Sequence, residues 1–173
     1  MAEPIYLTGF MGSGKTTFGR MLARALNRDF LDLDHLIENQ KGASVSELFS
    51  KHGEDGFRAL EHKALLSTQD MKNAIIATGG GAPCFQNNMD FMNRYGLTIY
   101  LKVSPEVLAK RLLPARDHRP LIAGKSESEL LDFIRTKLSE REPWYNKAQI
   151  IADTSGLSPH DTLRIVIKAL ELR

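Results

Sequence analysis

Short, unbroken runs of β-branched and other apolar residues alternate along this chain with longer segments in which apolar residues recur at helical spacing. Strands without polar alternation are typical of a sheet that is covered on both faces. Their alternation with helices predicts an α/β fold, in which a parallel sheet lies between layers of helices. The expected strands are residues 5–8, 30–32, 74–77, 97–101 and 150–152.

The expected helices are marked at their beginnings by serine. In two places a glutamate follows the serine by three residues, which is the capping box, where each side chain accepts a hydrogen bond from a free backbone amide. In two others proline follows the serine, and proline is favoured at the first helical position. The capping boxes are residues 44–47 and 126–129, the serine–proline pairs are 104–105 and 158–159, and further helices are expected over 15–26 and 35–39.

The chain has 173 residues, the size of one domain, which we expect to span residues 1–173. Hydrophobic residues make up 42% and charged residues 25%, an ordinary globular composition that argues against disorder. No apolar run approaches the ~18 residues that span a bilayer, and no basic segment precedes the first apolar run, so we expect neither a membrane partner nor a secretory signal. The single cysteine, Cys84, excludes an internal disulfide and fits a cytoplasmic location.

The net charge of +2 is too small to suggest general nucleic-acid binding, so no nucleic-acid partner is expected. Residues 110–125, however, hold five basic residues against one acid, Asp117. Most of this segment lies between a helix that should stop near Pro114 and one that should start near Ser126, so it is predicted to be a loop. Loops of this length are usually functional or disordered. The basic loop is therefore either an anion-binding element or a solvated surface segment.

Residues 9–16, GFMGSGKT, match the phosphate-binding P-loop pattern G-x-x-x-x-G-K-[ST]. The match follows a predicted strand and opens a predicted helix, which is the context that the motif requires. Its glycines let backbone amides turn inward around an anion, and the helix N-terminus favours negative charge. Lys15 supplies a cation for the phosphates, and the Thr16 hydroxyl is a suitable Mg²⁺ ligand. The motif predicts nucleotide triphosphate binding but does not separate kinases from GTPases or ATPase motors.

Two carboxylates, Asp32 and Asp34, follow the second predicted strand. If the backbone is extended there, side chains two residues apart point to the same side, which at the carboxyl end of a strand faces the ligand crevice. One acid could then hold Mg²⁺ through water while the other accepts a hydroxyl proton, as phosphoryl transfer to an alcohol requires. The alternative is that Asp34 merely caps the following helix.

Three glycines at 79–81 follow the expected strand at 74–77. Many P-loop enzymes place an Mg²⁺-organising aspartate after such a strand, but glycines here would let backbone amides approach a small ligand, or would form only a flexible turn. Three arginines, Arg58, Arg119 and Arg141, could each form a weak surface ion pair. A planar guanidinium is also what recognition of a substrate carboxylate requires.

Taken together, these motifs resemble the shikimate kinase family. That family combines the P-loop with a D-x-D after the second strand, an arginine near position 58, a T-G-G-G turn, an R-P-L in a lid and an R-x-P-x-Y near the end. All occur here in this order over residues 9–145. The resemblance implies the P-loop NTPase fold of the nucleoside-monophosphate-kinase type, a three-layer sandwich around a five-stranded parallel sheet with a mobile lid over about 114–125. It also implies transfer of the ATP γ-phosphoryl group to the 3-hydroxyl of shikimate, on the pathway to chorismate and the aromatic amino acids.

On the nucleotide side, the resemblance implies that Mg²⁺ is held by Thr16 and, through water, by Asp32. Arg119 would move in with the lid to meet the transferring phosphate, and Arg111 would stack over adenine. The residues that would hold the phosphates are Gly12, Ser13, Gly14, Lys15, Thr16 and Thr17.

On the acceptor side, the resemblance implies that Asp34 binds the shikimate hydroxyls and acts as the base. Arg58 and Arg141 would clamp the carboxylate, with backbone contacts from Gly80 and Gly81. The expected catalytic residues are Lys15, Asp34 and Arg119. This agrees with general chemistry, because phosphoryl transfer is catalysed mainly by positioning and by neutralising charge.

Two other functions are weighed against this one. A kinase acting on gluconate or a nucleoside monophosphate would use a similar sandwich, but the arginines, the D-x-D and the glycine turn together disfavour those acceptors. A regulatory nucleotide-binding module would be expected to have lost Lys15, Asp34 or Arg119, and all three are present. ATP and shikimate are the expected partners, and a monomer is expected because no heptad or apolar stripe stands out.

Overall fold

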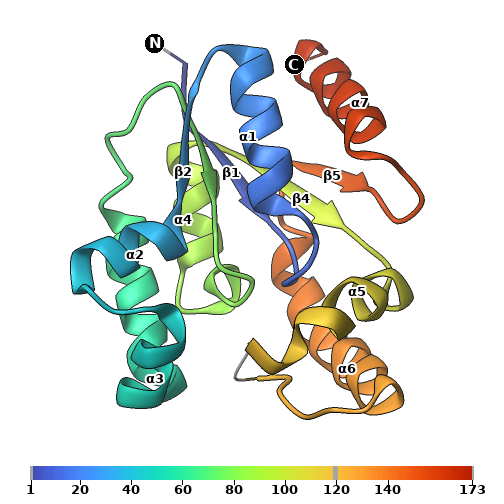
Figure 1. Cartoon of the computed structure of the whole chain (residues 1–173). Coiled ribbons are helices and arrows are strands. Elements are labelled where there is room, and N and C mark those ends of the chain that lie inside the picture. Colours follow the sequence, from blue (N-terminus) through green and yellow to red (C-terminus); the bar gives the residue numbers. More distant parts are fainter. Residues whose placement is uncertain (1, 119–120, 173) are drawn as a thin grey trace.

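Five parallel strands form one sheet in the order β2-β3-β1-β4-β5 (Figure 1). The computed structural model describes residues 2–118 and 121–172. All neighbouring strands pair in parallel, and each predicted strand is present with ends within one residue of those expected. The strands are β1 (Ile5–Thr8), β2 (Asp29–Asp32), β3 (Ala74–Ala77), β4 (Leu97–Lys102) and β5 (Ile150–Asp153). The predicted fold class is confirmed.

The helices begin where the serine signals predict. Ser44 and Ser126 form complete capping boxes, and Ser104 and Ser158 each accept a hydrogen bond from an amide in the first turn. None of the helices in the described part of the chain is long and apolar enough to cross a membrane. The α-helices are α1 (Lys15–Leu26), α2 (Leu33–Lys41), α3 (Val45–Leu66), α4 (Asn88–Tyr95), α5 (Pro105–Leu112), α6 (Glu127–Tyr145) and α7 (Pro159–Glu171), and the 3-10 helices are η1 (Ala82–Cys84) and η2 (Leu113–His118).

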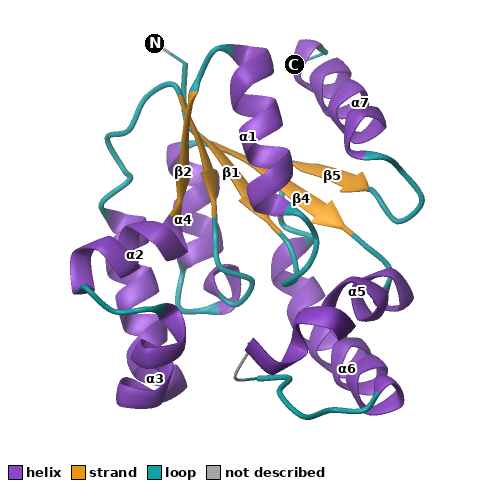
Figure 2. Cartoon of the chain, in the orientation of Figure 1, coloured by secondary structure: helices purple, strands orange, loops and turns teal. Residues whose placement is uncertain are grey.

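Successive side chains of the central strands point to opposite faces of the sheet, so each face packs against its own set of helices. Ile5 and Leu7 pack with residues of α1 and α7, while Tyr6 packs with residues of α2, α3 and α4. Tyr100 of β4 belongs to a further cluster with residues of α5 and α6. Figure 2 shows the resulting layers, with α1 and α4 on opposite faces of the sheet. The predicted three-layer sandwich is thereby confirmed.

Strand order reverses direction at β1, which pairs with β3 on one side and with β4 on the other. In open α/β sheets the ligand crevice lies at the carboxyl ends of the strands at such a switch point. The segment that leaves β1 there is the P-loop motif, residues 9–16. The topology therefore puts the strongest sequence motif where ligand binding is expected.

The segment 114–125 is not the uninterrupted loop that the sequence predicts. Its first part belongs to the 3-10 helix η2, because Leu113, the residue that follows α5, keeps a right-handed helical conformation and the chain continues into a tighter turn. Pro114 is compatible with this course, since the first turn of a helix needs no amide hydrogen from it. Arg119 and Pro120 lie outside the described residues, whereas Leu121 to Gly124 form turns.

A kink divides α3 into two arms. Gly53 has φ 70° and ψ −179°, which is not helical and lies in the region that favours glycine. Phe49 precedes the kink, and Arg58 and Glu61 follow it. The change of direction lets both arms contribute side chains to one cavity, described below.

Candidate active site

The P-loop forms an open cradle between β1 and α1. Gly12 and Gly14 have φ of 79° and 90°, so the amides of the loop turn inward as the motif predicts. Gly14 is the N-cap of α1, and the helix begins at Lys15. The Lys15 ammonium group donates to the carbonyls of Gly9 (2.8 Å) and Phe10 (2.9 Å), which places its positive charge at the loop. Such an arrangement suits a phosphate chain.

A first cavity of about 300 Å³ opens on the α1 and α7 side of this loop. Arg111 borders it and donates from Nη1 to the Gly12 carbonyl at 3.3 Å. The cavity therefore brings together four of the predicted phosphate-binding residues and the residue predicted to stack over adenine. Its lining consists of Gly12, Ser13, Gly14, Thr17, Phe18, Leu101, Arg111, Thr154, Leu157, Pro159 and Thr162.

Thr16 and Asp32 join the P-loop to the end of β2. The Thr16 hydroxyl donates to Asp32 Oδ2 at 2.7 Å, and Asp32 Oδ1 accepts from the Asp34 amide at 3.1 Å. Asp32 is therefore the N-cap of α2. The prediction that Asp32 and Asp34 share an extended backbone is wrong, because the helix begins at Leu33 and Asp34 lies in its first turn. The two carboxylates nevertheless border the same cavity.

This second cavity, of about 550 Å³, lies on the other side of the P-loop from the first. Met11 and Thr16 form its P-loop wall, and Asp34 lies beside them. Burial and then the Asp32 carboxylate raise the pKa of Asp34, against the opposing charge of Lys15. The remaining lining is His35, Glu38, Ser44, Val45, Ser46, Phe49, Phe57, Arg58, Glu61, Gly79, Gly80, Gly81, Ala115, Leu121, Arg141 and Asp32.

Arg58 is held by a buried ion pair with Glu61, one helical turn along α3, and by Glu54 at 3.3 Å. Only 1% of Glu61 is exposed, and its Oε1 has no hydrogen-bond partner within the described residues. Burial raises the pKa of Glu61 to about 7 in spite of the Arg58 charge. Glu61 was missed by the sequence reasoning, and its position three residues after Arg58 was the available signal.

Residues 79–81 are glycines because their neighbours in α3 and the P-loop leave little room for a Cβ. A Cβ at Gly79 would overlap Glu61 Oε1, a Cβ at Gly81 would overlap the Arg58 guanidinium, and one at Gly80 would lie 3.0 Å from the Met11 amide nitrogen. Because the turn carries no side chains, α3 and the P-loop both approach its backbone closely. All three glycines border the second cavity, as predicted for Gly80 and Gly81.

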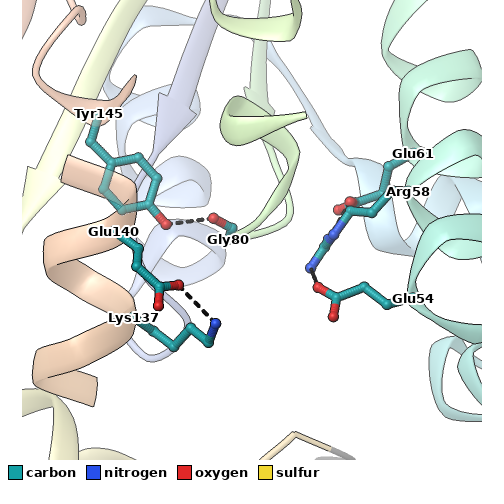
Figure 3. A network of polar contacts seen from close by, with 7 residues as sticks. All are labelled: Glu54, Arg58, Glu61, Gly80, Lys137, Glu140 and Tyr145. Atoms are coloured by element: carbon teal, nitrogen blue, oxygen red, sulfur yellow. Dashed lines mark hydrogen bonds and ion pairs between the residues drawn. The ribbon is translucent and has the colours of Figure 1, made fainter. Parts of the chain in front are cut away.

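Arg141 enters the second cavity from α6, opposite Arg58. It is 9% exposed, its guanidinium carbon lies 5.3 Å from the centre of the Phe10 ring, and its Nη1 has no partner in the described part of the chain. One turn later on α6, the Tyr145 hydroxyl donates to the Gly80 carbonyl (Figure 3). Thus the predicted acceptor-side residues are brought together, whereas Arg119 lies outside the described residues.

Comparisons with known proteins agree with this geometry. The family model described as shikimate kinase matches residues 11–171. The shikimate kinase of Bacteroides thetaiotaomicron is 46% identical over 167 residues, which are 96% of this chain and 95% of that protein. A crystal structure of shikimate kinase from the same organism has a TM-score of 0.92 at 45% identity and covers 98% of both chains. The shikimate kinase of Acinetobacter baumannii in complex with shikimate has a TM-score of 0.89 at 34% identity, covering 98% of this chain and 93% of that one.

Proposed function

The chain belongs to the shikimate kinase family and is an ATP:shikimate 3-phosphotransferase, and we propose that its two cavities hold the two substrates on either side of the P-loop. One observation carries this assignment. The second cavity gathers two buried guanidinium groups and the Asp34 carboxylate next to the P-loop, which matches a small acid that carries neighbouring hydroxyls.

ATP occupies the first cavity and the cradle. The amides of residues 12–17 surround the phosphate chain, and the Lys15 ammonium group exchanges its loop carbonyls for phosphate oxygens. The Arg111 guanidinium covers the adenine end of the cavity.

Mg²⁺ fits beside Thr16 and Asp32, because a hydroxyl and a carboxylate lie 2.7 Å apart there and hard cations prefer oxygen ligands. Thr16 would bind the ion directly and Asp32 through water. When bound, the ion neutralises charge on the phosphate oxygens. Asp32 also caps α2, so the same carboxylate fixes the position of Asp34.

Shikimate places its carboxylate between Arg58 and Arg141 and its hydroxyls toward Asp34, with backbone contacts from Gly80 and Gly81. The unpartnered Arg141 Nη1 gains an acceptor in this pose. Asp34 then accepts the proton of the attacking hydroxyl, and its raised pKa makes it a stronger base than an exposed aspartate. Lys15 stabilises the charge that develops on the transferring group.

The remaining features of the proposal concern the whole chain. Residues 1–173 form a single domain in which 114–125 close over the substrates, and Arg119 meets the transferring phosphate. The enzyme acts as a cytoplasmic monomer without a nucleic-acid or membrane partner.

A coupled ADP-release assay tests the acceptor. ADP formation from ATP should depend on added shikimate, while gluconate and CMP at the same concentration should leave only the background rate. Turnover with gluconate or CMP that equals turnover with shikimate would contradict the assignment of the second cavity.

A further inference from the structure

The Tyr145 side chain reaches the glycine turn from α6. It is fully buried, and its hydroxyl donates to the Gly80 carbonyl (Figure 3). Burial raises the pKa of Tyr145, so the hydroxyl keeps its proton and remains a donor. Tyr145 follows Arg141 by four residues, one helical turn. A single helix therefore carries both a charged group of the second cavity and a bond to its backbone wall.

The bonded carbonyl belongs to the peptide unit that joins Gly80 to Gly81. A trans peptide is planar, and its N–H points opposite to its C=O. Because Tyr145 binds the carbonyl from the α6 side, the Gly81 N–H points away from α6, toward the side on which Arg58 lies (Figure 3). That N–H makes no hydrogen bond within the described part of the chain. It is thus an oriented donor at the wall of the second cavity.

Glycine would not hold this orientation alone, because a residue without Cβ has wide conformational freedom. The α3 side chains and the P-loop limit the position of the turn, but their contacts at the Cβ positions of Gly79–Gly81 do not decide which way the Gly80–Gly81 peptide faces. From these contacts we propose that Tyr145 is a positioning residue for the acceptor. Its hydroxyl fixes the Gly80–Gly81 peptide so that the Gly81 N–H meets the substrate on the same side as Arg58. This inference rests on the proposed placement of shikimate in the second cavity.

A neighbouring tyrosine provides a control that distinguishes a positioning role of the Tyr145 hydroxyl from a packing role. Tyr100 lies against Tyr145 with ring centres 5.0 Å apart, and both rings belong to the same buried cluster. The Tyr100 hydroxyl is buried without a partner among the described residues. Removing either hydroxyl thus changes the same core by one oxygen atom, but only Tyr145→Phe removes the hydrogen bond to the Gly80 carbonyl.

The experiment compares the full-length wild type, Tyr145→Phe and Tyr100→Phe. In the coupled assay, Tyr145→Phe should raise the KM for shikimate about 3- to 10-fold, as expected from losing one hydrogen bond, with the KM for ATP unchanged. Fluorescence of Trp144, the single tryptophan of the chain, should report a matching loss of shikimate affinity without turnover. Tyr100→Phe should match the wild type in both.

Three results would overturn the proposal. The first is a Tyr145→Phe variant with the shikimate KM and affinity of Tyr100→Phe. The second is an equal rise in both KM values. The third is loss of cooperative thermal unfolding in Tyr145→Phe alone, which would make the hydroxyl structural. A wild type that fails to phosphorylate shikimate would instead refute the proposed function, so the two failures are distinguishable.

Discussion

Replacing Gly79 with alanine is expected to disable the acceptor side while leaving the nucleotide side intact. The added Cβ would overlap Glu61 Oε1 and lie 3.1 Å from its carboxyl carbon and 3.4 Å from Asp34 Oδ1. An exposed carboxylate would simply rotate away. Glu61 is 1% exposed and is ion-paired with Arg58, so its displacement moves the guanidinium as well.

Two effects follow, and each has a magnitude. Overpacking a dense core costs about 1–3 kcal/mol, which for a domain of this size lowers Tm by roughly 2–12 °C. A misplaced Arg58 weakens one charge-assisted hydrogen bond to the substrate carboxylate, worth about 1.5–3 kcal/mol, so the KM for shikimate should rise about 10- to 150-fold. The KM for ATP should not change, because Gly79 does not border the first cavity.

Calorimetry and the coupled assay measure both effects, and Gly156→Ala is the matched control. A Cβ at Gly156 meets nothing within 4 Å, and Gly156 does not border the second cavity, so this variant should retain the wild-type Tm and shikimate KM. If Gly79→Ala keeps the wild-type Tm and shikimate KM, then Glu61 and Arg58 can move freely, and the account of why the turn is bare is wrong.

Three further predictions concern single carboxylates and arginines. Asp34→Asn should lower kcat by at least about 100-fold while calorimetric ATP binding persists, and near-normal turnover would remove Asp34 as the base. Arg141→Ala should raise the shikimate KM by about 10-fold or more, whereas Arg135→Ala, on the exposed side of the same helix, should not; a defect in ATP binding would place Arg141 elsewhere. Since folding raises the pKa of Glu61 from 4.5 to about 7, the folded state binds that proton more tightly, so the contribution of Glu61 to stability is fully present below pH 4.5 and is lost as the pH rises through about 7. A Glu61→Gln variant should lack that part of the decline in Tm, and an identical pH dependence in both proteins would contradict the burial of an ionisable Glu61.

Local signals were sufficient for the elements of this fold. The unbroken apolar runs gave all five strands, and the serines at 44, 104, 126 and 158 each cap a helix. The P-loop pattern likewise depends on a few adjacent residues. These features were predictable because each is decided within one turn of helix or one strand.

The second cavity depends on contacts that are distant in sequence, and prediction from the chain alone was less complete there. The backbone at Asp34 was misjudged because Asp32 starts α2 by capping it, an outcome that competes with continuing the strand. Glu61 was missed because only the packing of α3 against the glycine turn removes it from water. Tyr145 was part of a recognised motif, but its bond to Gly80 joins residues 65 positions apart.

The thin partition between the two cavities bears on inhibitor design. Met11 borders one cavity and Gly12, the next residue, borders the other. A compound that links a nucleoside mimic to a cyclic carboxylic acid must therefore cross a single peptide unit, along the course of the phosphate chain, so a short anionic tether suits it better than a bulky apolar one. Its selectivity would come from the carboxylic acid half, because Arg58 and Arg141 border the second cavity and not the first.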